Sequence, residues 1–139
     1  MKILAAVDGS QSSQKALDWA AKFAKSFNAS LVAVHVVENF NYLDDIPLAS
    51  EAIKEKLANE GKMILEQAVS GAKGLGLEIE TEIVSGTNPP EGILDYARTN
   101  GVDHIVVGSR GRKGLDRFVM GSVAQRIVRH SPCTVTVVK

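Results

Sequence analysis

Short apolar runs alternate with amphipathic stretches along the chain, and this alternation constrains the fold more than any other feature. Residues 2–7 and 30–37 are rich in Val, Ile, Leu and Ala, as expected for strands buried on both faces. Residues 12–27 carry apolar side chains three and four positions apart, which is typical of an amphipathic helix. A strand followed by a helix and another buried strand favours parallel β-α-β units.

The rest of the chain continues this pattern. We predict helices over 49–73, 89–100 and 122–130, and strands over 77–84, 103–108 and 133–138. Five strands separated by four helices predict a doubly wound, Rossmann-like parallel sheet with strand order 3-2-1-4-5 and helices on both faces. We assign residues 1–139 to a single α/β domain, because a chain of 139 residues can bury one core and no internal repeat interrupts it.

The periodicity also predicts which side chains face the core. Phe27 continues the apolar stripe of the first helix, and Ile53 lies on the inward face of the second. Residues 77–84 alternate apolar and acidic side chains, so we expect a half-exposed edge strand with Ile83 on its inner side. Val128 is expected to point inward from the last helix, and Cys133 to be a buried apolar filler.

A glycine motif follows the predicted fourth strand and opens the last helix. It has the form Gly108-x2-Gly111-x9-Gly121-Ser122. A helix start offers unpaired N–H groups and the positive end of the helix dipole, and glycines let the backbone approach an anion. Ligands of doubly wound sheets bind where strand order reverses, here between the strands ending at Asp8 and Gly108. The motif therefore predicts a phosphate site, with an ordinary surface turn as the alternative.

Charge is balanced overall but unevenly distributed. Residues 1–107 hold nine basic and fifteen acidic side chains, whereas residues 108–139 hold seven basic side chains and one acidic. This asymmetry fits either an anion site or a dipolar surface without a ligand. Nucleic acid is not expected as a partner, because only 5% of residues are aromatic and the net charge is zero. The absence of a long apolar run and the single cysteine predict a cytoplasmic protein with no membrane association.

On these residues the sequence resembles the universal stress protein family, in its ATP-binding branch. The glycine motif matches the marker of that branch at every position. Three further segments resemble the corresponding segments of family members: ILAAVDGSQSSQKAL, GVDHIVVGSRGRKGL and SPCTVTVVK. The resemblance covers the whole chain and implies a fold like that of the adenine nucleotide alpha hydrolases. One position departs from the pattern, because Ala6 stands where some members have a proline.

The resemblance implies an ATP site at this edge of the sheet. Val7, Asp8 and the backbone of Val36 would flank the adenine, and Gly108 would lie under the ribose. Amides of the motif would bind the phosphates, and Mg²⁺ or Mn²⁺ would be held mainly by those phosphates. The residues implied for ATP binding are Ala6, Val7, Asp8, Val36, Val107, Gly108, Ser109, Arg110, Gly111, Arg112, Gly121, Ser122 and Val123.

The fixed positions of the motif are glycines and a serine, none of which could act as a general base, so no catalytic residue is assigned. We expect a nucleotide-dependent stress-response or signalling protein with little or no turnover and an unidentified protein partner. A slow ATPase or self-phosphorylating enzyme and a nucleotide-free scaffold stay as alternatives. The cations Arg110, Arg112 and Lys113 fit either a clamp on the terminal phosphate or exposed solubilising charges.

Residues 133–138 would form an edge strand in this topology, and its valines would leave that edge prone to pairing. Members of the family hide such an edge in a homodimer, so the resemblance implies a homodimer through 133–138. The three histidines have no ligand-like spacing, and no metal site is predicted. His35 is expected to be a satisfied, semi-buried side chain rather than a catalytic base.

Overall fold

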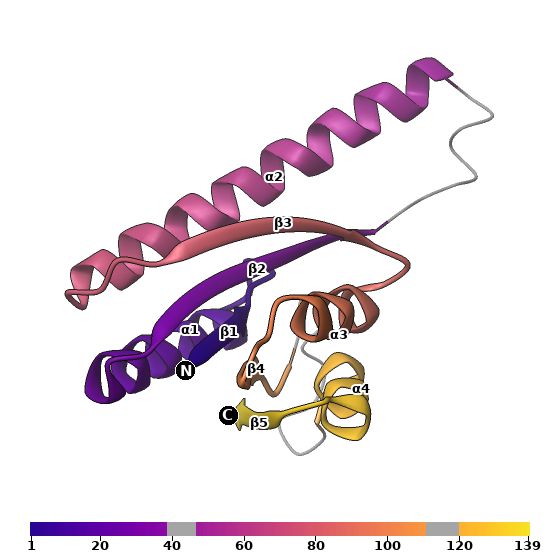
Figure 1. Cartoon of the computed structure of the whole chain (residues 1–139). Helices are drawn as coiled ribbons and strands as arrows, with labels where there is room; N and C mark the ends of the chain where they lie inside the picture. Colours follow the sequence, from indigo (N-terminus) through magenta and orange to yellow (C-terminus); the bar gives the residue numbers. More distant parts are fainter. Residues whose placement is uncertain (39–46, 111–119) are drawn as a thin grey trace.

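A five-stranded parallel sheet with strand order β3-β2-β1-β4-β5 forms the centre of the computed structural model (Figure 1). The structure describes residues 1–38, 47–110 and 120–139, with 47–50 described by their backbone alone. The strands are β1 (Lys2–Ala6), β2 (Ser30–Glu38), β3 (Glu80–Gly86), β4 (His104–Gly108) and β5 (Thr134–Val138). The helices are α1 (Gln11–Phe27), α2 (Pro47–Gly74), α3 (Pro89–Thr99) and α4 (Ser122–His130). The predicted fold class and strand order are confirmed.

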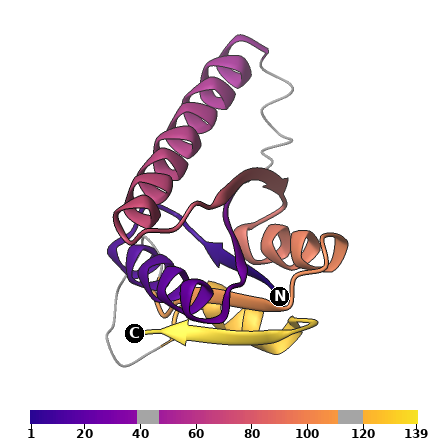
Figure 2. The same ribbon diagram turned by 60° about the vertical axis from the view of Figure 1, so that its left-hand side comes forward.

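Two helices pack on each face of the sheet, as Figures 1 and 2 show. Ile3 and Ala5 of β1 lie in one core with side chains of α1 and α2, whereas Leu4 and Ala6 lie in the other with α3 and α4. Successive side chains of a strand point to opposite faces, so a strand covered on both sides needs apolar residues throughout. The continuous apolar runs in the sequence follow from this requirement.

Local side-chain bonds set where the helices begin. Ser10 Oγ accepts a hydrogen bond from the Ser13 amide at 3.1 Å and caps α1. Asn88 Oδ1 accepts from the Glu91 amide at 3.0 Å and caps α3. The nearby Asp8 is not the cap, and its Oδ1 accepts from the Ser10 amide. These caps fix the turns that follow β1 and β3 at the carboxyl edge of the sheet.

The edge strand β3 begins three residues later than predicted. The Leu77 amide donates to Ala72 O at 3.0 Å, and Gly76 has a φ of +79°, so the chain is still closing the end of α2 there. Leu77 and Ile79 pack partly buried against the α1–α2 core from this connection. Ile83 is 40% exposed because it lies on an edge strand that α2 covers only in part.

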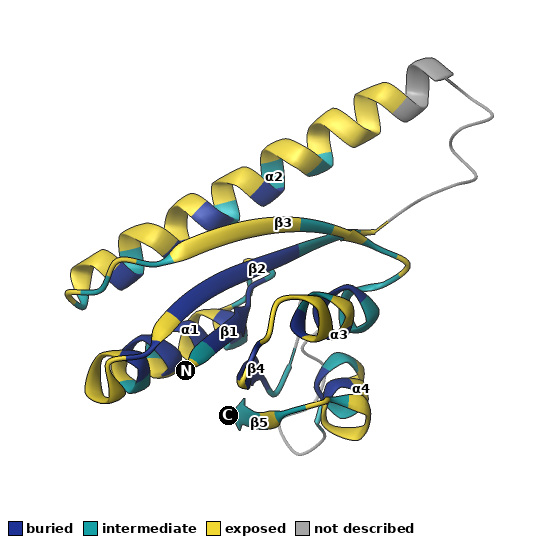
Figure 3. Ribbon diagram, viewed as in Figure 1, coloured by how far each residue is buried: buried dark blue, intermediate teal, exposed yellow. Residues whose placement is uncertain are grey.

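Several side chains expected in the core lie at the surface. Phe27, at the end of α1, is 65% exposed and contacts the Phe23 ring at a centroid distance of 4.5 Å. Ile53 is 37% exposed because the amino-terminal half of α2 projects beyond the sheet (Figure 3). Val128 points outward, because Ala124 and Ile127 already occupy the inner face of α4. Cys133 is half-buried and only borders the α3–α4 core.

Within the described segments, none of the helices combines the length and the apolar character needed to cross a bilayer.

The contrast between Ile127 and Val128 can be tested by truncation. Ile127→Ala should lower the free energy of unfolding by about 2–5 kcal/mol, because its side chain is fully buried. Val128→Ala should change it by less than about 1 kcal/mol, because that side chain is 47% exposed. Urea unfolding followed by circular dichroism measures both. Equal losses would contradict this orientation of α4.

Candidate functional site

The carboxyl ends of the three central strands lie at one level. Ala5 pairs with Val106 of β4, and Ala6 pairs with Val34 of β2. Extending these registers by two residues sets Val7 beside Gly108 and Asp8 beside Val36. The structure therefore brings together the part of the predicted site that comes from the strand ends: Ala6, Val7, Asp8, Val36, Val107 and Gly108.

Ser109 connects this edge to the last helix. The Gly121 amide donates to Ser109 O at 2.6 Å, and the Ser109 amide donates to Val138 O at 2.8 Å. The start of α4 and the end of β5 are thus both bonded to the residue that follows β4. Gly111 and Arg112, which the motif assigns to the phosphates, lie outside the described residues.

The amino terminus of α4 has no side-chain cap. Gly121 occupies the N-cap position and provides no side-chain acceptor, and the first helical bond runs from the Gln125 amide to Gly121 O at 3.0 Å. The amides of Ser122 and Val123 precede that bond, so the helix leaves them for a partner outside its own turns. Such a terminus favours an anion through its N–H groups and through the helix dipole.

Asp8 is held in a tight turn between β1 and α1. Its Oδ1 accepts a hydrogen bond from the Ser10 amide at 2.8 Å, and its own amide donates to Ser13 Oγ at 3.3 Å. Gly9, between them, has a φ of +83°, which a glycine adopts without strain. The turn fixes the Asp8 carboxylate at the sheet edge and leaves the capping of α1 to Ser10.

Ser12, in the first turn of α1, is a site residue that the glycine motif does not include. Its Oγ accepts a hydrogen bond from the Arg110 amide at 3.1 Å. A Cβ atom added at Gly108 would meet Ser12 Oγ and would lie 2.7 Å from the Ser12 carbonyl carbon and oxygen. Gly108 is thus required by the close packing of α1 on β4, a reason that the motif alone does not give.

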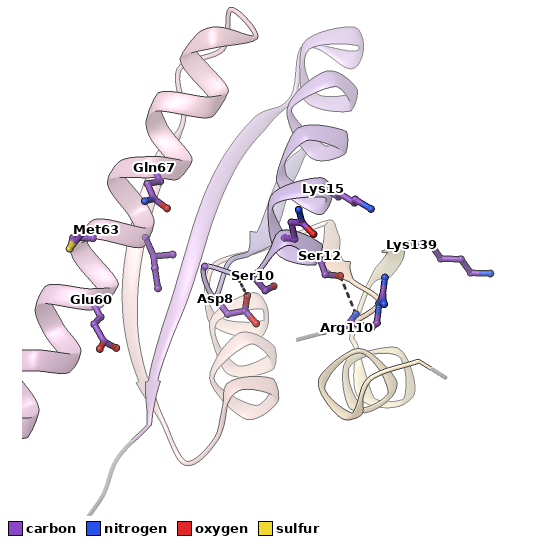
Figure 4. A pocket seen from close by; sticks show the side chains of 12 residues that line it. Asp8, Ser10, Ser12, Lys15, Glu60, Met63, Gln67, Arg110 and Lys139 are labelled. Carbon is purple, nitrogen blue, oxygen red and sulfur yellow. Dashed lines mark hydrogen bonds between the residues drawn. The ribbon is translucent and has the colours of Figure 1, made fainter. Parts of the chain in front are cut away.

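A cavity of about 610 Å³ opens beside these residues (Figure 4). The β1–α1 turn, residues 8–12, forms its floor with Lys15, and Arg110 and Lys139 border it. The opposite wall is one stripe of α2: Glu60, Met63, Ile64 and Gln67. The i, i+3, i+4, i+7 spacing of that stripe was the available signal, but its mixed chemistry does not resemble a binding motif. Of the predicted residues, Asp8 and Arg110 line the cavity, whereas Gly121, Ser122 and Val123 do not.

The histidines have structural surroundings. His35 is buried, and its Nδ1 lies 2.8 Å from Val7 O, as expected for a satisfied histidine. His104 Nε2 lies 2.7 Å from Thr136 Oγ1, and burial lowers the pKa of His104 below its usual value. In the described residues, no three His, Cys, Asp or Glu side chains form a group that could hold a metal ion.

The model of the Universal stress protein family matches residues 1–139. The chain belongs to the universal stress protein family. Among relatives, universal stress protein YxiE of Bacillus subtilis is 38% identical over 99% of this chain and 98% of its own length. A universal stress protein of Methanocaldococcus jannaschii is 36% identical over 99% of this chain and 81% of its own length.

Solved universal stress proteins share the fold. The UspA protein of Lactobacillus plantarum has a TM-score of 0.86 and 29% identity, covering 100% of this chain and 97% of its own. A universal stress protein in complex with cAMP has a TM-score of 0.79, and one from Archaeoglobus fulgidus in complex with dAMP has 0.78. Both are 27% identical to this chain, and each match covers 100% of it. The match spans 97% of the chain in the cAMP complex and 98% of the chain in the dAMP complex. Nucleotide binding is thus a property of relatives in this universal stress protein family.

Gly108 is expected to be sensitive to a single added carbon. Gly108→Ala should destabilise the fold by roughly 1–3 kcal/mol, because the new Cβ overlaps the Ser12 backbone, which cannot rotate away. Gly74→Ala is the matched control, since nothing lies within 4 Å of a Cβ there. Thermal unfolding of both variants measures the difference. If Gly108→Ala unfolds at the same temperature as Gly74→Ala, the close packing of α1 on β4 is wrong.

Proposed function

We propose that this chain binds adenine nucleotides, with ATP as its ligand, at the carboxyl edge of the sheet and acts through the bound state rather than through turnover. The observation that carries the proposal is the 2.6 Å bond from the Gly121 amide to Ser109 O. It holds the uncapped start of α4 beside the end of β4. The cAMP and dAMP complexes of relatives support an adenine ligand.

The base and sugar occupy the strand ends in this proposal. Val7 and Asp8 of the β1–α1 turn, with the backbone of Val36, flank the adenine, and Ala6 and Val107 lie just beneath. An ionised carboxylate such as Asp8 only accepts hydrogen bonds, which suits the exocyclic amine of adenine or a ribose hydroxyl. The fixed turn around Asp8 supports this assignment, because it holds the carboxylate at the edge of the sheet.

The phosphates occupy the start of α4. Gly121, Ser122 and Val123 provide backbone amides, and the exposed Ser122 adds a hydroxyl donor. Mg²⁺ or Mn²⁺ would enter with the nucleotide and be held mainly by phosphate oxygens, since Mg²⁺ commonly binds through substrate phosphates and one or two protein groups. The residues around the motif fit this arrangement because their donors suit phosphate and not a metal cage.

Gly121→Leu should test the phosphate site without disturbing the fold. Its φ of −60° suits any residue, whereas the leucine side chain would crowd the helix start, and thermal unfolding checks that the variant stays folded. We expect MgATP affinity to fall more than tenfold by titration calorimetry, with Gly74→Leu unchanged. The nucleotide content of the purified protein after denaturation gives a second measurement. Wild-type protein that carries and binds no adenine nucleotide would contradict the proposal.

The same samples separate binding from turnover. Incubation of the wild type with MgATP should release phosphate no faster than Gly121→Leu, and its mass should not change. Phosphate release or a phosphorylated chain that depends on Gly121 would instead favour a slow ATPase or a self-phosphorylating enzyme.

We further propose that two copies of this single domain pair through β5. Among the described strands, β5 lies at one edge of the sheet and pairs with β4. Val138 O accepts from the Ser109 amide, so Val138 presents its backbone groups to β4. Backbone groups alternate sides along a strand, and Val135 and Val137 therefore present theirs to the free edge. An edge of this kind is a template for pairing with a second chain.

A proline at the free edge should break this pairing selectively. Val137→Pro removes an N–H that points away from β4, so the sheet inside each copy keeps its bonds. Light scattering should give a dimer for the wild type at micromolar concentration and a monomer for the variant. Circular dichroism checks that the variant stays folded. A monomeric wild type, or a folded Val137→Pro variant that stays dimeric, would overturn pairing through β5.

A further inference from the structure

The cavity beside the glycine motif has a cationic side that the motif does not explain. Lys15, Arg110 and Lys139 border it from three places: the beginning of α1, the end of β4 and the residue after β5. Figure 4 shows their side chains on the side of the cavity opposite α2. In the part of the chain that is described, none of the three forms an ion pair with a carboxylate. The described residues thus place three cationic side chains along one side of the cavity.

Arg110 relates this cationic side to the start of α4. The Arg110 amide donates to Ser12 Oγ at 3.1 Å, and the residue before it, Ser109, accepts from the Gly121 amide at 2.6 Å. Two short bonds thus connect the helix start, through the end of β4, to the first turn of α1. A chain of phosphates that begins at the α4 amides can continue over Arg110 to the cationic side of the cavity.

The wall formed by α2 indicates which end of such a ligand faces it. Glu60 and Gln67 of α2 lie there with the apolar side chains of Met63 and Ile64. A carboxylate repels phosphate, whereas an apolar and hydrogen-bonding wall suits the flat face and edge of a base. The Asp8 carboxylate on the floor repels phosphate as well, so the distribution of charge directs the base toward α2 and Asp8 and the phosphates toward Lys15 and Lys139.

We propose that Lys15 and Lys139, together with Arg110, bind the phosphates beyond the first and make this site select adenine nucleotides by phosphate number. The inference rests on the proposed nucleotide site and names the ligand class that it prefers, which is nucleoside triphosphates over monophosphates. Both lysines lie outside the glycine motif. Each lysine would form a charge-assisted contact that only a longer phosphate chain can reach.

Titration calorimetry with adenosine, AMP, ADP and ATP tests this selection. In the wild type, affinity should rise with each added phosphate. Lys15→Gln and Lys139→Gln should each weaken ATP binding by roughly tenfold, as for one lost charged hydrogen bond, and leave adenosine and AMP unchanged. Lys22→Gln is the matched control, because it removes the same charge from α1 at an exposed position that does not line the cavity.

Competition by inorganic tripolyphosphate isolates the phosphate contacts from those of the base. It should displace ATP from the wild type and do so less effectively in the two lysine variants. Equal affinity of the wild type for AMP and ATP, or an equal loss for AMP and ATP in Lys15→Gln and Lys139→Gln, would overturn the inference while leaving nucleotide binding intact. Failure of all four adenine ligands to bind would instead contradict the proposed nucleotide site itself.

Discussion

The contact between the first turn of α1 and the end of β4 is the constraint on which the site depends. Gly108 lies so close to Ser12 that no side chain fits between them, and the Arg110 amide then bonds to Ser12 Oγ. Packing interactions thus bring the turn after β1 and the turn after β4 together without a ligand. A site whose two halves are held by the fold loses less conformational freedom on binding than one that assembles around its ligand.

Ser109 extends this constraint to the rest of the carboxyl edge. Its carbonyl bonds to the start of α4, and its amide bonds to the end of β5. The proposed phosphate site and the proposed dimer edge therefore share one backbone unit. A shift of α4 that lengthened its bond to Ser109 would also strain the bond from Ser109 to β5. The proposed ligand binding and the proposed dimer would therefore both depend on the position of Ser109.

The sequence predicted what periodicity and turn chemistry control. Buried strands on both faces gave unmistakable apolar runs, and Asn88 with its following prolines marked the start of α3. The burial of side chains near the ends of helices was harder to predict, because it depends on how far a neighbouring element extends. Phe27 and Ile53 are apolar at helical spacing but lie where α1 ends and where α2 projects beyond the sheet.

The same distinction holds at the site. The glycine spacing indicated the α4 terminus, since it is a local pattern read along the chain. Ser12, Glu60, Gln67 and Lys139 line or bound the site only because distant elements meet there, and no local pattern reports that meeting. Prediction from one sequence therefore named Asp8 and Arg110, which line the cavity, but did not indicate the side chains that distant elements bring beside them.

The two bonds of Ser109 have a consequence for how such a chain can diversify. Because its carbonyl bonds to the start of α4 and its amide bonds to the end of β5, both ends are held by backbone groups of one residue. Every residue except proline carries these two groups. Exchange of the Ser109 side chain can thus alter the chemistry beside the sheet edge while α4 and β5 keep their places in the fold.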